Sequence, residues 1–121
     1  MNVPKQSPLA RVALSRVGRH VHMTFPSKVI DGNAVRDMFE HTATLTEEGN
    51  PRLIVDFTGI TFVNSGAMGM LITMRKKLMH VGGEMRVVID HDQVRHAFHT
   101  TRLDAMLDLR PTLDDARADW Q

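Results

Sequence analysis

The sequence contains no cysteine, and only 5% of its residues are aromatic. Without cysteine the chain forms no disulfide bonds and offers no thiolate ligands, which excludes a disulfide-rich scaffold and a cysteine-bound zinc site. Long apolar runs are lacking too, since none approaches the roughly 20 residues that span a bilayer. Residues 1–9 also lack the apolar core of a signal peptide. We therefore expect a cytoplasmic protein that does not insert into membranes.

The sequence also lacks a large excess of positive or negative residues. The formal net charge is +1, and the basic residues are scattered singly apart from Arg75-Lys76-Lys77. We interpret that cluster as the solvated face of a helix, so nucleic acid is not an expected partner. A chain of 121 residues with 42% hydrophobic content suits one core. We expect a flexible tail over residues 1–9 and a single domain over residues 10–121.

The first part of the domain has the period of two that is typical of half-buried strands. Gly18 supplies the turn between the two alternating stretches, which predicts an antiparallel hairpin with its first strand at a sheet edge. The alternating apolar residues are Ala10, Val12, Leu14, Val21, Met23 and Phe25. His20 and His22 share the other face with Thr24, and we expect that face to be solvated rather than to bind a metal.

The remaining elements alternate between helices and strands. Helical periodicity covers residues 33–48, with Asp31 or Asn33 as the cap, and residues 65–81, 93–101 and the stretch after Thr112, with Trp120 docked on the body. Buried strands are expected at residues 53–55, at 85–89 and near 109. This order predicts an α/β fold with a mixed five-stranded sheet, in which the edge strand is antiparallel and the rest largely parallel, and about four helices.

The stretch from Asp56 to Gly69 organises the chain, because it reads as the end of a strand, a loop and an abrupt helix start. Ser65 lies at that helix start, just beyond a strand's carboxyl end. The free N–H groups and the dipole of a helix N-terminus favour an anion. Local chemistry alone leaves two interpretations: Ser65 caps its helix, or Ser65 carries a phosphoryl group there.

The helix over residues 65–81 has a wider apolar surface than a sheet needs to cover it. One arc faces the sheet, and a side stripe extends it through Met68, Ile72 and Met79. That stripe is either buried under a neighbouring helix or partly exposed for a partner, which is a common use of adaptable methionine side chains.

The segment resembles the phosphoacceptor motif of STAS domains, the anti-sigma-factor antagonist family. The matching residues are Asp56-Phe57-Thr58 and then Phe62-Val63-Asn64-Ser65-Gly66-Ala67-Met68-Gly69. In that family the first serine of the motif is phosphorylated by a partner kinase, and it corresponds to Ser65. The sequence departs from the family where Asn64 replaces Asp and Gly66 replaces Ser or Thr. The resemblance runs from Ala10 to Trp120 and implies a single STAS domain.

The function that the resemblance implies is a phosphorylation-gated regulator. In its unphosphorylated form it binds an anti-sigma factor or a related histidine-kinase-like serine kinase, and a metal-dependent serine phosphatase resets it. The expected partner-binding residues are Lys28, Asp31, Asp56, Thr58, Asn64, Ser65, Gly66, Met68 and Ile72. A stressosome-type scaffold and a STAS subunit of a transport system are the alternatives. We expect a monomer or weak dimer.

Catalysis is not expected from the sequence. Val63-Asn64-Ser65-Gly66-Ala67 lacks the flanking glycines of a nucleophile elbow, and no glycine-rich phosphate loop with a lysine is present. His96 and His99 have a spacing that can bind metal, but no third ligand is evident, so we interpret them as solvated. The sequence therefore predicts no enzyme, no cofactor and no metal.

Overall fold

The computed structural model describes residues 12–120. The predicted tail, the first residues of the predicted hairpin at 10 and 11, and Gln121 lie outside that range. Five strands form the main sheet in the order β1-β2-β4-β6-β7. Their bounds are Ala13–Val17 for β1, His20–Thr24 for β2, Arg52–Asp56 for β4, Glu84–Val88 for β6 and Leu109–Arg110 for β7. Only β1 pairs antiparallel with its neighbour, so the predicted mixed sheet is confirmed.

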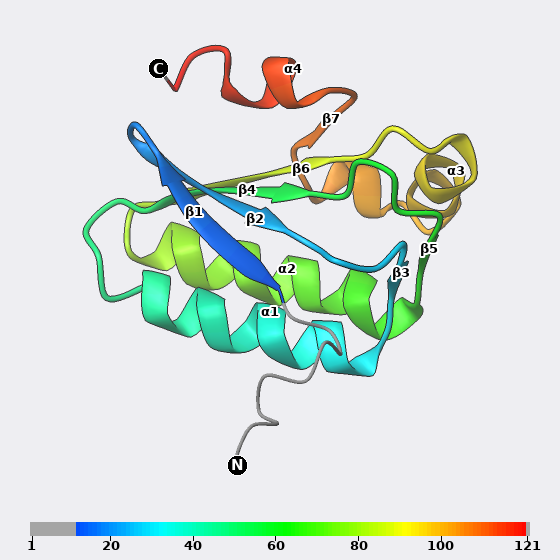
Figure 1. Ribbon diagram of the computed structural model, residues 1–121, viewed down its shortest axis with the longest axis horizontal. Coiled ribbons are helices and arrows are strands. Elements are labelled where there is room, and N and C mark those ends of the chain that lie inside the picture. Colours follow the sequence, from blue (N-terminus) through cyan, green and yellow to red (C-terminus); the bar gives the residue numbers. More distant parts are fainter. Residues whose placement is uncertain (1–11, 121) are drawn as a thin grey trace.

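Helices cover both faces of this sheet. α1 (Gly32–Leu45) and α2 (Ser65–His80) lie side by side on one face, while α4 (Leu113–Arg117) lies on the other (Figure 1). α3 (Asp92–Thr100) and a short 3-10 helix, η2 (Leu103–Ala105), fill the connection between β6 and β7. The predicted helices all form, each within a few residues of its expected bounds.

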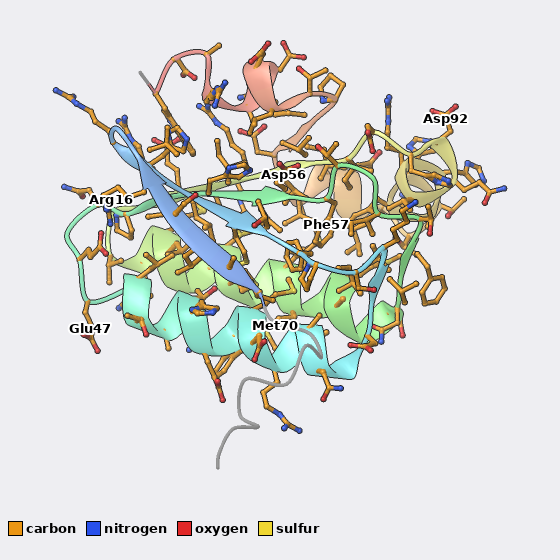
Figure 2. All side chains as sticks on the ribbon, viewed as in Figure 1. Arg16, Glu47, Asp56, Phe57, Met70 and Asp92 are labelled. Atoms are coloured by element: carbon orange, nitrogen blue, oxygen red, sulfur yellow. The ribbon has the colours of Figure 1, made fainter. Side chains whose placement is uncertain are left out.

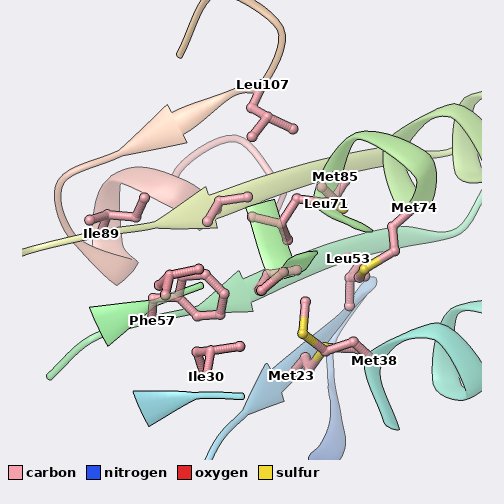
Figure 3. Packing of buried hydrophobic residues seen from close by; sticks show 14 of the residues in the cluster. Met23, Ile30, Met38, Leu53, Phe57, Leu71, Met74, Met85, Ile89 and Leu107 are labelled. Carbon is pink, nitrogen blue, oxygen red and sulfur yellow. The ribbon is translucent and has the colours of Figure 1, made fainter. Parts of the chain in front are cut away.

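The core has two parts because the side chains of the central strands point alternately to the two faces. Leu53 and Val55 of β4 join the larger cluster under α1 and α2, together with Met23, Met38 and Met74 (Figure 3). The smaller cluster, on the opposite face, consists of Ile54, Val88, Ala116 and Trp120. Trp120 is 2% exposed, so the prediction that it docks on the body is confirmed.

A second, two-stranded sheet lies beside the main one and was not predicted. Its strands, β3 (Val29–Ile30) and β5 (Phe62–Val63), run parallel and place Val29 opposite Phe62. Ile30 and Val63 point into the core, whereas Val29 and Phe62 point outward. The elements predicted from the sequence left residues 26–32 without a strand, between the hairpin and the helix over residues 33–48. Two-residue strands are too short to show a periodic pattern, so the sequence carried no signal for them.

Two predictions about exposure are wrong. His20, expected on a solvated face, is 3% exposed because the C-terminal segment with Trp120 covers that face of β2. His22 on the same face is half-buried and bonded to Asp56. The helical period of residues 33–48 predicts Phe39 on the apolar side of the helix with Met38 and Thr42, but Phe39 is 38% exposed and Ala34 is buried instead.

Candidate functional site

Ser65 is the first residue of α2, directly beyond the carboxyl end of β5. Its helix is capped by Asn64, which has an extended backbone and whose Oδ1 accepts a hydrogen bond of 2.7 Å from the N–H of Ala67. Ser65 is exposed, and within residues 12–120 its hydroxyl group has no hydrogen-bond partner. The interpretation that Ser65 caps the helix is therefore wrong, because the neighbouring amide side chain makes the cap.

The first turn of α2 is open to an anion. It contains no acidic side chain, so nothing in the turn repels negative charge at the positive end of the helix dipole. A Cβ added at Gly66 would meet only Asn64 Oδ1, at 3.5 Å, which is an ordinary contact. Gly66 has no side chain that could cover the start of α2. A larger residue would also fit at this position, because the space around it is open.

The loop before α1 and the loop before α2 lie together. Thr61 donates its backbone N–H to the carbonyl oxygen of Lys28 at 2.8 Å, and β3 runs beside β5. Asp31 follows β3 and caps α1, where Oδ1 accepts from the N–H groups of Asn33 and Ala34, each at 3.1 Å. The structure therefore brings Lys28, Asp31 and Ser65 to the same end of the molecule.

Asp56 is occupied by contacts within the chain. Its Oδ2 lies 2.7 Å from His22 Nε2, and its Oδ1 accepts from both the backbone N–H and the hydroxyl group of Thr58. Figure 2 shows Asp56 with Phe57 at the end of β4. Burial raises the pKa of Asp56, but the hydrogen bonds from Thr58 and His22 outweigh it, and the pKa lies below its ordinary value. Asp56 and Thr58 therefore stabilise the turn that follows β4. Within residues 12–120 no hydrogen bond joins either one to Ser65.

The side stripe of α2 is only partly covered. Met68 and Ile72 are half-buried and pack on the larger core cluster, whereas Met79 is 52% exposed. α1 contacts the opposite flank of α2, where the ammonium group of Lys77 lies 5.5 Å from the centre of the Phe39 ring. The stripe is therefore not fully buried under a neighbouring helix. It is partly exposed, which is the second of the two interpretations.

Sequence reasoning missed an apolar pair next to the Ser65 loop. Phe62 is 54% exposed and Val29 is 42% exposed, and they are cross-strand neighbours in the small sheet. An outward Phe62 followed by an inward Val63 was the available signal, but it is a single alternation. The pair gives this end of the molecule an apolar surface beside Ser65.

The other sites considered in the sequence gain no support. His99 pairs with Asp104 at 2.8 Å on the exposed side of α3, and no group of three or more ligating side chains suited to a metal exists within residues 12–120. In the same part of the chain, no helix has both the length and the apolarity needed to cross a membrane.

Comparisons with known proteins agree on one family. The model of the STAS domain matches residues 12–116. Among solved structures, the chain is similar to an anti-sigma factor antagonist from Mycobacterium paratuberculosis, with a TM-score of 0.78, 22% identity, and coverage of 93% of this chain and 94% of that one. It is also similar to a candidate anti-sigma factor antagonist from Thermotoga maritima, with a TM-score of 0.68, 15% identity, and coverage of 89% and 92%.

No curated protein sequence matches the chain. The two structural likenesses establish the fold, and the family model spans most of the described residues. Together with the strand order and the serine at the start of α2, these matches lead to one conclusion: the chain belongs to the STAS domain family.

Proposed function

We propose that this protein is a phosphorylation-gated, non-catalytic regulator of the anti-sigma factor antagonist type, with Ser65 as the phosphoacceptor. One observation carries the proposal: Ser65 is exposed at the first position of α2 while Asn64 caps the helix. The hydroxyl group is therefore available to a kinase without loss of the cap. A serine that capped its own helix would have to give up that bond when phosphorylated.

Electrostatics at the helix start supports this role. A phosphoryl group brings about −1.5 to −2 charges, and the N-terminus of a helix tolerates them. Asn64 makes the capping bond through an amide, so it adds no negative charge next to the modified serine. Asn and Asp are about equally good caps, which means that the departure from the family motif at this position preserves the helix start.

The expected partner is an anti-sigma factor or a histidine-kinase-like serine kinase, with a metal-dependent serine phosphatase that reverses the modification. Lys28, Ser65 and the exposed pair Val29 and Phe62 supply one polar and apolar surface for the unphosphorylated complex. An aromatic side chain in the centre of such a surface commonly anchors an interface. We assign the protein to the cytoplasm, as a monomer or weak dimer.

The arrangement around Ser65 favours an acceptor over a catalytic nucleophile. An activated serine needs a general base within about 2.6–3.2 Å. Within residues 12–120 no histidine or carboxylate bonds to the Ser65 hydroxyl, and His22 and Asp56 are bonded to each other instead. The protein therefore depends on a partner for the phosphoryl transfer.

Phosphosite mapping tests the proposal. Protein isolated from its native cells, analysed by intact mass and fragmentation, should carry a single phosphoryl group on Ser65, and Ser65→Ala should lose it. Thr61→Ala is the matched control, because Thr61 is exposed in the same loop. Phosphorylation at Thr58 or Thr61 with Ser65 unmodified would contradict the assignment.

A further inference from the structure

The C-terminal segment, residues 111–120, lies on the sheet face opposite α1 and α2, where the buried Arg86 and the half-buried Arg110 both donate hydrogen bonds to it. The guanidinium group of Arg86 donates to the carbonyl oxygen of Ala116 and to Asp119 Oδ1, each at 2.6 Å. It also lies 3.9 Å from the centre of the Trp120 ring. Apolar support comes from a small cluster of Ile54, Val88, Ala116 and Trp120, with the partly buried Leu113 packed against it. Elements with so little apolar contact open locally before the rest of a domain unfolds.

His20 lies under this segment in a setting that suits only a neutral ring. The side chain is 3% exposed, its ring centre is 6.1 Å from that of Trp120, and neither ring nitrogen makes a hydrogen bond of good geometry. A cavity of about 500 Å³ between the hairpin turn and α4 borders the ring and is also lined by Asp114 and Arg117.

The charges around His20 do not favour a cation. β1 contributes only the uncharged Val17 to the cavity. Two of the three carboxylates on the segment are paired, Asp114 with Arg117 at 3.4 Å and Asp119 with Arg86 at 2.6 Å. The third, Asp115, is exposed and does not line the cavity. The charged or titratable groups that face the ring or its indole neighbour are His22, Arg52, Arg86, Asp114, Arg117 and Asp119.

We propose that residues 111–120 form a pH-sensitive latch, which docks on the sheet while His20 is neutral and detaches when His20 gains a proton. Detachment lets water reach the imidazolium ring and uncovers the face of the sheet that carries Ile54, Val88 and Arg86. The larger core under α1 and α2 is not part of the latch, so the rest of the domain stays folded.

The direction of the pH effect follows from linkage. Burial, together with His22 and Arg117, lowers the pKa of His20 below 6.5, and the backbone of Trp120 opposes this only in part. The docked state therefore binds fewer protons than the open state as pH falls below 6.5. Docking is fully present above that value, and its equilibrium constant falls by up to about tenfold for each pH unit down to the pKa of the docked state.

Native-state hydrogen exchange on the full chain tests the latch. The amides of Ala116 and Trp120 are bonded within the segment, to the carbonyl oxygens of Thr112 and Arg117, so their protection reports docking. After correction for intrinsic rates, their opening constant should rise by up to about eightfold between pH 7.0 and 5.5. Amides in the middle of α2 should not follow. Emission from Trp120, the only tryptophan in the chain, should shift to the red in parallel.

Substitutions of His20 test whether the pH effect comes from this imidazole ring. His20→Phe keeps an aromatic partner for Trp120 without a titrating group, and His20→Gln serves if the first variant folds poorly; either should abolish the pH dependence. His99→Gln, on the exposed side of α3, should retain it. The latch is overturned by an equal rise in the His20 variants, by an equal rise in α2, or by no rise in the wild type.

Discussion

At the scale of single residues, the start of α2 assigns the capping of the helix and the exposed hydroxyl group to two different residues. Asn64 accepts the hydrogen bond from Ala67, and Ser65 projects into solvent. The helix is therefore capped by a residue other than the proposed phosphoacceptor. This division would allow Ser65 to change its charge and its hydrogen bonds while the helix that presents it stays in place.

The two residues should respond very differently to alanine. Asn64→Ala removes the cap and should lower the free energy of unfolding by about 0.5–2 kcal/mol. Ser65→Ala should change it by less than about 0.5 kcal/mol, because alanine is the better helix former and no bond is lost. Denaturant unfolding followed by circular dichroism measures both. If Ser65→Ala proves the more destabilising substitution, the assignment of the cap is wrong.

Arg86 is a buried residue that contacts the C-terminal segment at Ala116, Asp119 and Trp120. Arg86→Ala leaves the carbonyl oxygen of Ala116 without its donor and removes the nearer of the two cations over the Trp120 ring, the other being Arg52. An unsatisfied buried polar group costs about 1–3 kcal/mol. We expect a loss of about 2 kcal/mol in unfolding free energy and a red shift of Trp120 emission. Asp119 is mostly exposed, so its release adds little.

Two controls belong to this measurement. Arg86→Lys keeps the charge but not the planar fork that reaches Ala116 and Asp119 together, and it should recover only part of the loss. Arg95→Ala, on the exposed side of α3, should be close to wild type. Equal stability of Arg86→Ala and Arg95→Ala would show that the arginine does not hold the segment.

At the scale of elements, the side stripe of α2 joins core and surface. Met68→Ala and Ile72→Ala should weaken partner binding by more than Thr73→Ala, which alters the solvated face of the same helix. Both residues also pack on the core, so a loss of about 1–2 kcal/mol in unfolding free energy is expected as well. Titration calorimetry at a temperature where every variant is folded separates the two effects. If Met68→Ala and Ile72→Ala both bind the partner with unchanged affinity, the stripe contributes only to the packing of the core.

The sequence predicts these elements unevenly, and the reasons are physical. The start of α2 was expected at Ser65 because Asn64-Ser65-Gly66 precedes a helical period, but Asn and Ser cap almost equally well, so the capping residue was open. β3 and β5 were missed because a pair of residues has no period. The alternation in β2 identified its two faces, yet it could not show that Trp120, distant in sequence, covers His20.

At the scale of the whole molecule, the order of the elements was enough to predict the sheet. Right-handed crossovers between buried strands leave few topologies for this order, and the observed arrangement β1-β2-β4-β6-β7 is among them. Two surfaces were harder to predict, the one beside Ser65 and the sheet face under the C-terminal segment. The surface at Ser65 depends on the exposed pair Val29 and Phe62, and the opposite face of the sheet depends on Arg86, whose burial no local pattern signals.

The same architecture predicts how phosphorylation should act. Phosphorylation of Ser65, or Ser65→Asp, should leave the melting temperature within a few degrees of wild type, because the start of α2 is exposed and tolerates negative charge. The cost should fall on the complex, where an interface that packs against Ser65 would bury an unpaired charge at a cost of several kcal/mol.

Even a loss of 2.8 kcal/mol would weaken binding about a hundredfold, so the release requires no large rearrangement of this domain. Calorimetry with the purified partner should therefore give at least about a hundredfold lower affinity for the phosphorylated form, while Thr61→Asp, in the same loop, binds much closer to wild type. Equal affinities for the two forms at equal stability would rule out gating at Ser65 and favour the scaffold or transport roles. A phosphorylated form that has itself unfolded would instead mean that the switch acts on the fold, which the open first turn of α2 argues against.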